Sequence, residues 1–493
     1  MPDLGYSMSR FTVRAVQTWA SLGTRFLPFA DVATPDLPLG RLMRLSLFQV
    51  SVGMALVLMV GTLNRVMIVE LEVPASLVAV MISLPLVFAP FRVLIGFRSD
   101  VHRSALGWRR VPFIWRGTML QFGGFAVMPF ALLVLAGQGE SGHLPVWIGQ
   151  LGAGISFLLV GAGLHMVQTV GLALATDLAP AEDQPKVVGL MYVMLLVGMI
   201  ASALVFGQVL VDFTPARLIQ VIQGAAVVTV ILNVTAMWKQ ETRDRSRAVA
   251  PDREATFRDA WDEFISGRHA RLRLLAIGLG TMGFGMSEVL LEPYGGQVLQ
   301  FDVASTTKLT ATLAMGGLIG FVFAAKVLAR GYDPFRMAAA GALVGIPAFL
   351  AIIAAAPLHS AVLFVVGTFF VGVGGGLFSH GTLTATMTHA PRERIGMVLG
   401  TWGAVQATAA GVGMALGGVV RDAVLVSPLA TGSGPAIPYI FVYAIEIALL
   451  AATLLAMLPL FGIRPSDAVT AIAKAAPLQG GIAGFPDGGR ASS

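Results

Sequence analysis

Two histidines, His165 and His380, stand inside long apolar stretches, where an imidazole can ligate a metal ion or hydrogen-bond to a neighbouring helix. Gln168 follows the first histidine by about one helical turn. Glycines surround both histidines, and those near His380 include Gly372 and Gly376. Such glycines either leave room for a flat ligand beside an imidazole or let two membrane helices pack closely. The residues alone leave both interpretations open.

Polar residues also stand late in two apolar stretches, where charged side chains are costly. Asn64 and Arg65 lie late in one stretch, and Glu288 and Glu292 lie late in another. We predict that Arg65 forms an ion pair with one of the two glutamates, because opposite charges offset part of each other's cost in an apolar interior. This pair would act either as a fixed clamp or as a relay for protons or substrate.

A third group of residues lies in a polar loop and comprises Gly96, Asp100, Gly107, Arg109 and Arg110. The group resembles the loop signature of the major facilitator superfamily, except that the gap between the aspartate and the second glycine is longer. The aspartate can cap a helix N-terminus and pair with an arginine, which would make the group a cytoplasmic latch. The alternative is that the two arginines only anchor the loop on the cytoplasmic side.

The composition indicates which elements must position these groups. The chain has 493 residues, of which 56% are hydrophobic and 12% are charged, and its mean hydropathy is +0.79. Soluble proteins carry about 25% charged residues, so this composition predicts an all-α polytopic membrane protein. The absence of cysteine excludes disulfides and thiolate metal sites. Basic residues punctuate the apolar stretches instead of forming a basic domain, so no nucleic-acid partner is expected.

Twelve apolar stretches are long enough to cross about 30 Å of hydrocarbon as helices. They cover residues 45–68, 76–97, 112–136, 147–177, 187–211, 216–238, 273–293, 305–329, 336–356, 360–388, 395–420 and 438–462. Short strings repeat at matching places in the two sets of six, which predicts two pseudo-symmetric halves at 45–238 and 273–462.

The remaining segments are expected on the cytoplasmic side, because lysine and arginine concentrate at one end of the predicted spans. Residues 1–44 are predicted to form an N-terminal segment with an amphipathic helix, and residues 239–272 a linker with a second amphipathic helix. Residues 463–493 are predicted to form a disordered tail, because they are rich in glycine, alanine and proline.

Several longer strings resemble the bacteriochlorophyll delivery family of the major facilitator superfamily, the PucC/LhaA type. They are Leu37–Gln49, Leu63–Leu71, Gly107–Trp115, Leu291–Leu299 and Gly376–Thr384. The resemblance implies the major facilitator fold with twelve transmembrane helices, in the inner (intracytoplasmic) membrane of a phototrophic bacterium. It also implies a role in assembling light-harvesting complexes.

The resemblance further implies that the protein binds bacteriochlorophyll a transiently, with a carotenoid as a second candidate pigment. The expected partners are the antenna α and β polypeptides, the reaction centre, bacteriochlorophyll synthase and the lipid bilayer. The magnesium of the chlorin takes one axial ligand, for which His165 or His380 is the expected donor. The long terminal segments favour the branch that serves the core antenna, light-harvesting 1, over the branch that serves light-harvesting 2.

The sequence is compatible with two functions. The sequence holds no phosphate-binding loop, zinc-protease motif or nucleophile elbow, so no enzyme is expected. The alternative to an assembly factor is a secondary transporter of a hydrophobic or amphipathic solute. A transporter of soluble solutes would cluster polar groups midway along the spans, but those positions are mainly apolar here. This pattern favours a lipid-like ligand such as a pigment.

Overall fold

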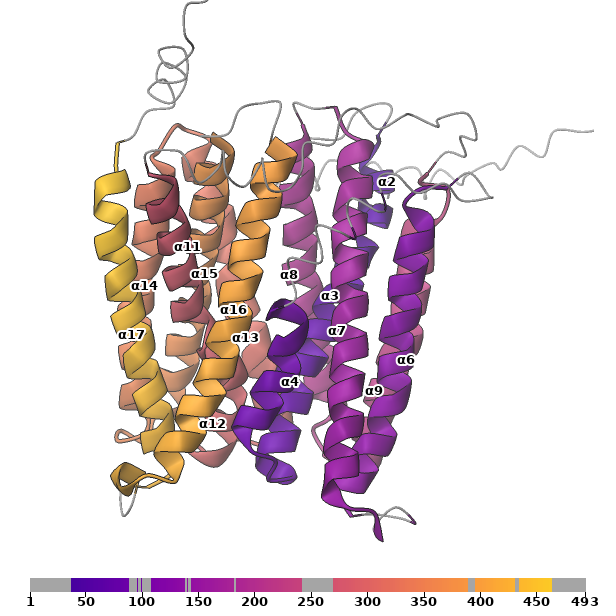
Figure 1. Cartoon of the computed structure of the whole chain (residues 1–493), viewed down its shortest axis with the longest axis vertical. Coiled ribbons are helices and arrows are strands. Elements are labelled where there is room, and N and C mark those ends of the chain that lie inside the picture. The colour runs from indigo at the N-terminus through magenta and orange to yellow at the C-terminus, as the bar shows by residue number, and fades with distance from the viewer. Residues whose placement is uncertain are drawn as a thin grey trace, which may run out of the picture.

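The computed structural model describes residues 37–87, 108–137, 143–180, 183–241, 269–388, 395–430 and 434–462, together with residues 95, 99 and 140. All regular secondary structure in these residues is helical, and the helices run side by side in one bundle (Figure 1). The two predicted amphipathic helices and the predicted C-terminal tail lie outside the described residues.

The first six spans follow one another along the chain. The first consists of α2 (Leu39–Leu45), α3 (Leu47–Leu56) and two π-helical segments, η2 (Val57–Leu63) and η3 (Val66–Glu70). The next five are α4 (Ala75–Val87), α6 (Val111–Leu135), α7 (Val146–Asp177), α8 (Gln184–Val209) and α9 (Pro215–Met237).

The second six spans have a similar order, and the seventh, like the first, is divided into shorter segments. It consists of α11 (Ala270–Gly285), the 3-10 segment η5 (Ser287–Val289) and α12 (Leu291–Gln297). The last five are α13 (Val303–Leu328), α14 (Pro334–Ala355), α15 (Ala361–Thr388), α16 (Ile395–Leu425) and α17 (Ile437–Met457). Short 3-10 turns, η7 (Pro428–Ala430) and η8 (Leu458–Leu460), follow the last two.

Eleven of the twelve predicted spans correspond to membrane-length helices in the described part of the chain. Among the described residues, 11 helices are long and apolar enough to cross a membrane, and Ala75–Leu86 is a shorter apolar helix. This shorter helix begins the predicted span 76–97, most of whose later residues lie outside the described part of the chain. The prediction of an all-α polytopic membrane fold is confirmed.

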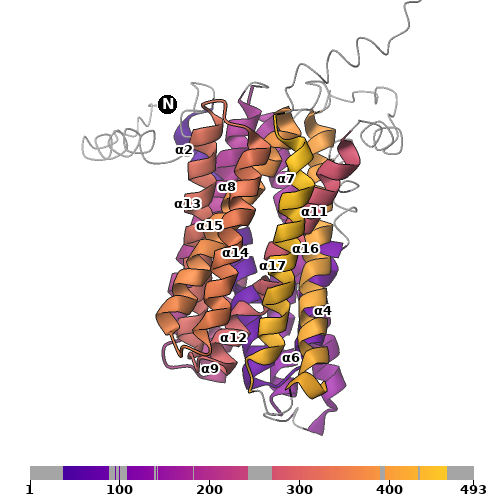
Figure 2. The same ribbon diagram turned by 90° about the vertical axis from the view of Figure 1, so that its left-hand side faces the viewer.

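The bundle has two ends, which we call the linker side and the far side. The linker side holds α2 and the residues that flank the segment between the halves, and Arg41 there donates from Nε to Gln240 Oε1 at 3.0 Å. The far side holds α12, which lies at the end of the bundle opposite α2 (Figure 2).

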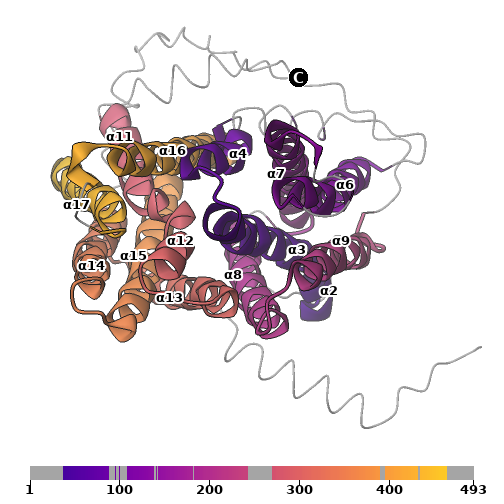
Figure 3. The same cartoon turned by 90° about the horizontal axis from the view of Figure 1, so that it is seen from below.

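The helices form two groups that meet along two pairs of helices. Helices α2 to α9 gather in one group and α11 to α17 in the other, with α4 against α16 and α8 against α13 between them (Figure 3). The contacts are close towards the far side: a Cβ on Gly418 would lie 2.5 Å from that of Ala79, and one on Gly207 would lie 2.7 Å from Lys308 Cγ. The two halves therefore touch directly at the far side.

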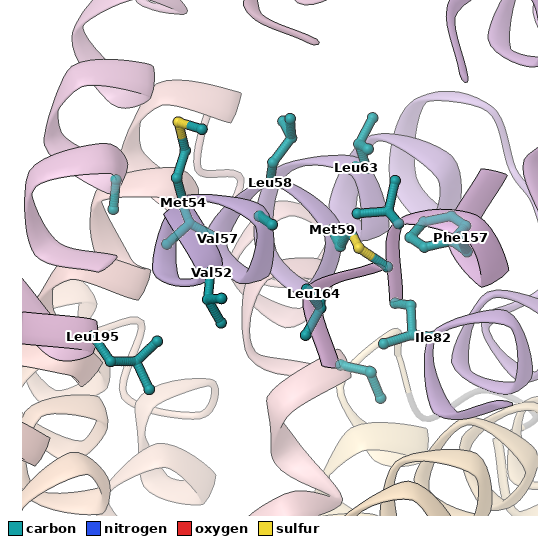
Figure 4. Packing of buried hydrophobic residues seen from close by; sticks show 14 of the residues in the cluster. Val52, Met54, Val57, Leu58, Met59, Leu63, Ile82, Phe157, Leu164 and Leu195 are labelled. Atoms are coloured by element: carbon teal, nitrogen blue, oxygen red, sulfur yellow. The ribbon is translucent and has the colours of Figure 1, made fainter. Parts of the chain in front are cut away.

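A large cluster of apolar side chains surrounds the first span. Buried side chains of α3 and η2, including Val57 and Leu58, cluster with Ile82 of α4, Phe157 of α7 and Leu195 of α8 (Figure 4). This agrees with the sequence, in which the mid-span positions are mainly apolar.

Candidate functional site

The seventh span is interrupted where it meets the first span. Pro293, near the start of α12, has no N–H to donate to the carbonyl of Val289 four residues earlier. The freed carbonyl oxygen accepts a hydrogen bond from Asn64 Nδ2 at 2.7 Å. A side chain of the first half therefore provides the hydrogen bond that the carbonyl group at the break in the seventh span would otherwise lack. This bond joins the two halves.

Arg65 follows directly and is 3% exposed. Its guanidinium pairs with Glu70 of the same span, and its Nη2 donates to the carbonyl oxygen of Phe301 at 3.0 Å. The predicted ion pair with Glu288 or Glu292 therefore had the wrong partner. The reason is local geometry: residues 66–70 form a π-helical segment, in which the backbone bonds join positions five apart and bring Arg65 and Glu70 to the same face.

Glu292 lies instead where helices of both halves meet, and it is 3% exposed. Its Oε1 accepts a hydrogen bond from the Thr310 hydroxyl of α13. A Cβ on Gly61 of η2 would lie 2.5 Å from the same oxygen, so the carboxyl group occupies the space that the missing side chain of Gly61 leaves. The hydroxyls of Thr62 and Thr307, 3.3 Å apart, extend this polar contact between the halves.

Glu288, the other predicted partner of Arg65, has an exposed side chain in η5. The preceding residue, Ser287, donates its backbone N–H to Glu446 Oε1 of α17 at 2.6 Å. Glu446 is fully buried, so its carboxyl group supports the interrupted seventh span from within the second half. The sequence alone indicates no role for this residue.

A second far-side contact between the halves was not predicted. Asp422 of α16 accepts the backbone N–H of Ser76 at 2.7 Å, at the start of α4, where the helix dipole favours a carboxylate. Arg421 donates to Gln297 Oε1 at 2.7 Å and lies over the ring of Tyr439. The sequence signal was the adjacent pair of opposite charges at the end of an apolar span.

The prediction that Gly372 and Gly376 form a slot for a flat ligand is wrong. A Cβ on Gly372 would overlap the carbonyl oxygen of Leu313, and one on Gly376 would overlap the carbonyl oxygen of Gly317. The α13 backbone fills the space beside both glycines. They act as close-packing positions between α13 and α15, which was the alternative interpretation.

His380 is packed against aromatic residues. Its ring centroid lies 4.3 Å from that of Phe321 in α13, and Phe321 lies 6.5 Å from Tyr192 of α8 in the other half. His165 is 8% exposed and Gln168 is 9% exposed, both in α7. The glycine next to this pair, Gly163, packs against the backbone of α6. Pigment ligation by either histidine stays a prediction.

The two latch arginines bind Asp177, whereas the sequence predicted Asp100 as the acidic member of the latch. Arg109 Nη2 lies 2.6 Å and Arg110 Nε 3.0 Å from Asp177 Oδ2, at the end of α7. Arg110 Nη1 also donates to Ser99 Oγ at 2.6 Å. The arginines therefore tie the start of α6 to the end of α7. The other latch residues, Gly96, Asp100 and Gly107, lie outside the described residues.

Glu241 is a further member of this group. Its carboxylate accepts the backbone N–H groups of Arg109, Arg110 and Val111 at 2.7–3.0 Å, which satisfies donors that the start of α6 would otherwise leave open. A carboxylate directly after the sixth span was visible in the sequence, but its partner lies 130 residues earlier and no local pattern connects the two.

Solved structures of membrane transporters have a fold similar to that of this chain. The nucleoside transporter NupG has a TM-score of 0.59 at 15% identity, with 86% of this chain and 100% of that chain covered. A bacterial homologue of the iron transporter ferroportin in an inward-facing state has a TM-score of 0.62 at 14% identity, covering 85% and 98%. These similarities support a major facilitator type of fold.

Sequence comparison is more specific. "Protein PucC" of Rhodovulum sulfidophilum is 66% identical, covering 86% of this chain and 94% of that protein. "Protein PucC" of Cereibacter sphaeroides is 59% identical over 92% and 98%. An "uncharacterized protein in puhA-bchM intergenic region" of Rhodobacter capsulatus is 48% identical over 94% and 98%. Because the family model described as PUCC protein matches residues 62–464 as well, the chain belongs to the PUCC protein family.

Proposed function

We propose that this protein is an assembly factor for light-harvesting complexes that binds bacteriochlorophyll a and delivers it to antenna polypeptides. Membership of the PUCC protein family carries the proposal. The apolar interior around the first span supports it, because a chlorin with a long hydrocarbon tail needs apolar surroundings. The transporter-like fold leaves a carrier of a hydrophobic solute as the alternative.

The neighbourhood of His380 favours this histidine as the pigment ligand. Phe321 places an aromatic ring 4.3 Å from the imidazole, and Tyr192 of the other half lies 6.5 Å from Phe321; flat rings pack well on such aromatic surfaces. Bound bacteriochlorophyll would supply a magnesium ion that accepts one axial nitrogen ligand. A carotenoid would need only the apolar surface.

Copurification tests the proposed function. The tagged protein is purified from a phototrophic host that makes antenna α and β polypeptides, and the near-infrared absorbance and the polypeptide content are recorded. Bacteriochlorophyll together with α polypeptide supports the proposal. The α polypeptide without pigment indicates an assembly subunit that carries no pigment, and neither of them, combined with solute flux in liposomes, indicates a transporter.

The variant His165→Leu/His380→Leu is expected to lose more than half of the bound bacteriochlorophyll, because both candidate imidazole ligands are removed. The measurement is pigment extracted per mole of purified protein. His359→Asn serves as the control: this residue lies between α14 and α15 with φ of 47°, a conformation that asparagine also tolerates. Wild-type occupancy in the double variant would reject ligation by these histidines.

The proposal leaves two candidate recipients of the pigment, light-harvesting 1 and light-harvesting 2. The terminal segments favoured light-harvesting 1, whereas three relatives at 58–66% identity carry the name PucC, the side of the family associated with light-harvesting 2. Deleting the gene and recording the near-infrared absorbance bands of both antennae distinguishes these assignments. The antenna that depends on this protein loses its band. The same strain shows whether the reaction centre or bacteriochlorophyll synthase copurifies less well with the antenna.

We also propose that the linker side faces the cytoplasm, with both termini there, in the inner membrane. Because the chain has no cysteine, single cysteines report topology directly. Val426→Cys on the far side is expected to react with a membrane-impermeant maleimide in intact spheroplasts, and Tyr332→Cys on the linker side only after lysis. Both side chains are exposed, at 85% and 46%. The reverse pattern would invert the orientation.

A further inference from the structure

The buried carboxyl group of Glu292 lies at the far-side contact between the halves and has an incomplete set of partners. The hydroxyl of Thr310, in the second half, donates a hydrogen bond to Oε1. Gly61 of the first half packs against the same oxygen. Oε2 has no hydrogen-bond partner among the described residues. The side chain is 3% exposed, so neither oxygen reaches bulk solvent in this state.

Among the described residues, no charged group forms an ion pair with Glu292. From the first span, the nearby Arg65 is paired with Glu70 and with the Phe301 carbonyl group. From α13, Lys308 packs against Gly207 of α8; it lies two residues from Thr310 and therefore on the opposite side of that helix.

Two ionisable residues close to Glu292 and Thr310 in the chain are themselves acids and supply no positive charge. Glu288 lies in η5, which precedes α12, and Asp302 caps the start of α13 by accepting the backbone N–H of Ser305 at 2.8 Å. An ionised Glu292 would therefore be a buried carboxylate without a counter-ion within 4.0 Å in the described part of the chain, an arrangement that proteins avoid by protonation.

We propose that Glu292 is a proton-binding site that couples protonation to closure of the far side. In the closed state Gly61 and Thr310 enclose the neutral acid. When the halves separate at the far side, Gly61 leaves with the first half, water reaches the carboxyl group, and the carboxylic acid releases one proton to solvent on that side and becomes a carboxylate. Closure takes the proton back. No redox step or co-reactant is involved, and the coupling does not depend on the identity of the cargo.

Glu446 provides a matched contrast. It is also a fully buried carboxyl group with one oxygen, Oε2, that has no hydrogen-bond partner among the described residues. Its other oxygen accepts a hydrogen bond from the backbone N–H of Ser287, which belongs to the same half as Glu446. Separation of the halves leaves this environment in place. Glu446→Gln is therefore expected to leave the pH dependence of closure unchanged.

The test measures far-side distance against pH. Val211→Cys and Val426→Cys, both exposed and on opposite halves, are spin-labelled in the cysteine-free chain in nanodiscs, and distances are recorded from pH 5 to 9. We expect the ratio of open to closed protein to rise with pH, by up to about tenfold per unit, the limit for one proton. Glu292→Gln is expected to keep the far side closed at every pH.

Two results would overturn the proposal: a distance in the parent chain that does not change with pH, or a Glu292→Gln variant that responds to pH as the parent does. A second measurement avoids dependence on the folding of that variant. In the parent protein, a hydrophobic carbodiimide should modify Glu292 at low pH and progressively less as pH rises, as read by peptide mass spectrometry. Glu292 that stays unmodified at every pH would also reject the site.

Discussion

Gly372→Ala is expected to destabilise the folded protein by about 1–3 kcal/mol, the range for overpacking a close-packed interior. The added methyl group would overlap the carbonyl oxygen of Leu313 in α13, which is backbone and cannot rotate away. The helices would have to separate along a contact that Gly316, Gly320 and Gly376 also form by close approach. Denaturant unfolding in mixed micelles measures the loss.

Gly375→Ala is the matched control for this prediction. The residue lies in the same helix, but the nearest atom to a Cβ there is Phe284 Cδ1 at 4.0 Å, so the methyl group fits. Alanine also favours the helical backbone over glycine by about 1 kcal/mol, so this variant should be neutral or more stable. Equal losses in the two variants would contradict the packing role assigned to Gly372.

Arg65→Met is expected to cost about 2–3 kcal/mol of stability. Removing one partner of a fully buried ion pair costs about 3–5 kcal/mol, and the lower figure applies because the Glu70 side chain is 29% exposed. The hydrogen bond to the Phe301 carbonyl oxygen is lost as well. The same micelle unfolding measures the change.

Controls for Arg65 come from a second far-side ion pair and from double-variant cycles. Arg217→Met breaks an exposed pair with Asp212 and should cost less than about 1 kcal/mol. Arg65→Met should be coupled to Glu70→Gln and additive with Glu288→Gln. Coupling to Glu288 instead of Glu70 would restore the partner that the sequence predicted.

The spans were predictable because a membrane helix needs a long apolar run, which is a local property of the sequence. The positions of Asn64 and Glu292 at the contact of the halves were predictable for the same reason: polar residues inside such runs are few. Their partners were not. The choice of Glu70 by Arg65 depends on a π-helical segment, and the Val289 carbonyl group becomes available only because of Pro293.

The glycines illustrate a different limit of the sequence. Clusters beside His380 fit a ligand slot and a helix contact equally well, because both need an absent side chain. Only the position of α13 distinguishes them, and it depends on contacts more than 50 residues apart in the chain. In the same way, Asp177 became the partner of Arg109 and Arg110 through the packing of α6 on α7.

The wide turns of the first span have a consequence for how the two halves move. In η2 and η3 each backbone bond closes over five residues instead of the four of an α-helix. If one wide turn tightened, everything beyond it would rotate by roughly 100°, the angle of one residue. Asn64 would then swing away from Val289, and Arg65 would lose its alignment with Glu70. Tightening of this helix would therefore break contacts at the far side, and hydrogen exchange along residues 57–70 is expected to change when the far side opens.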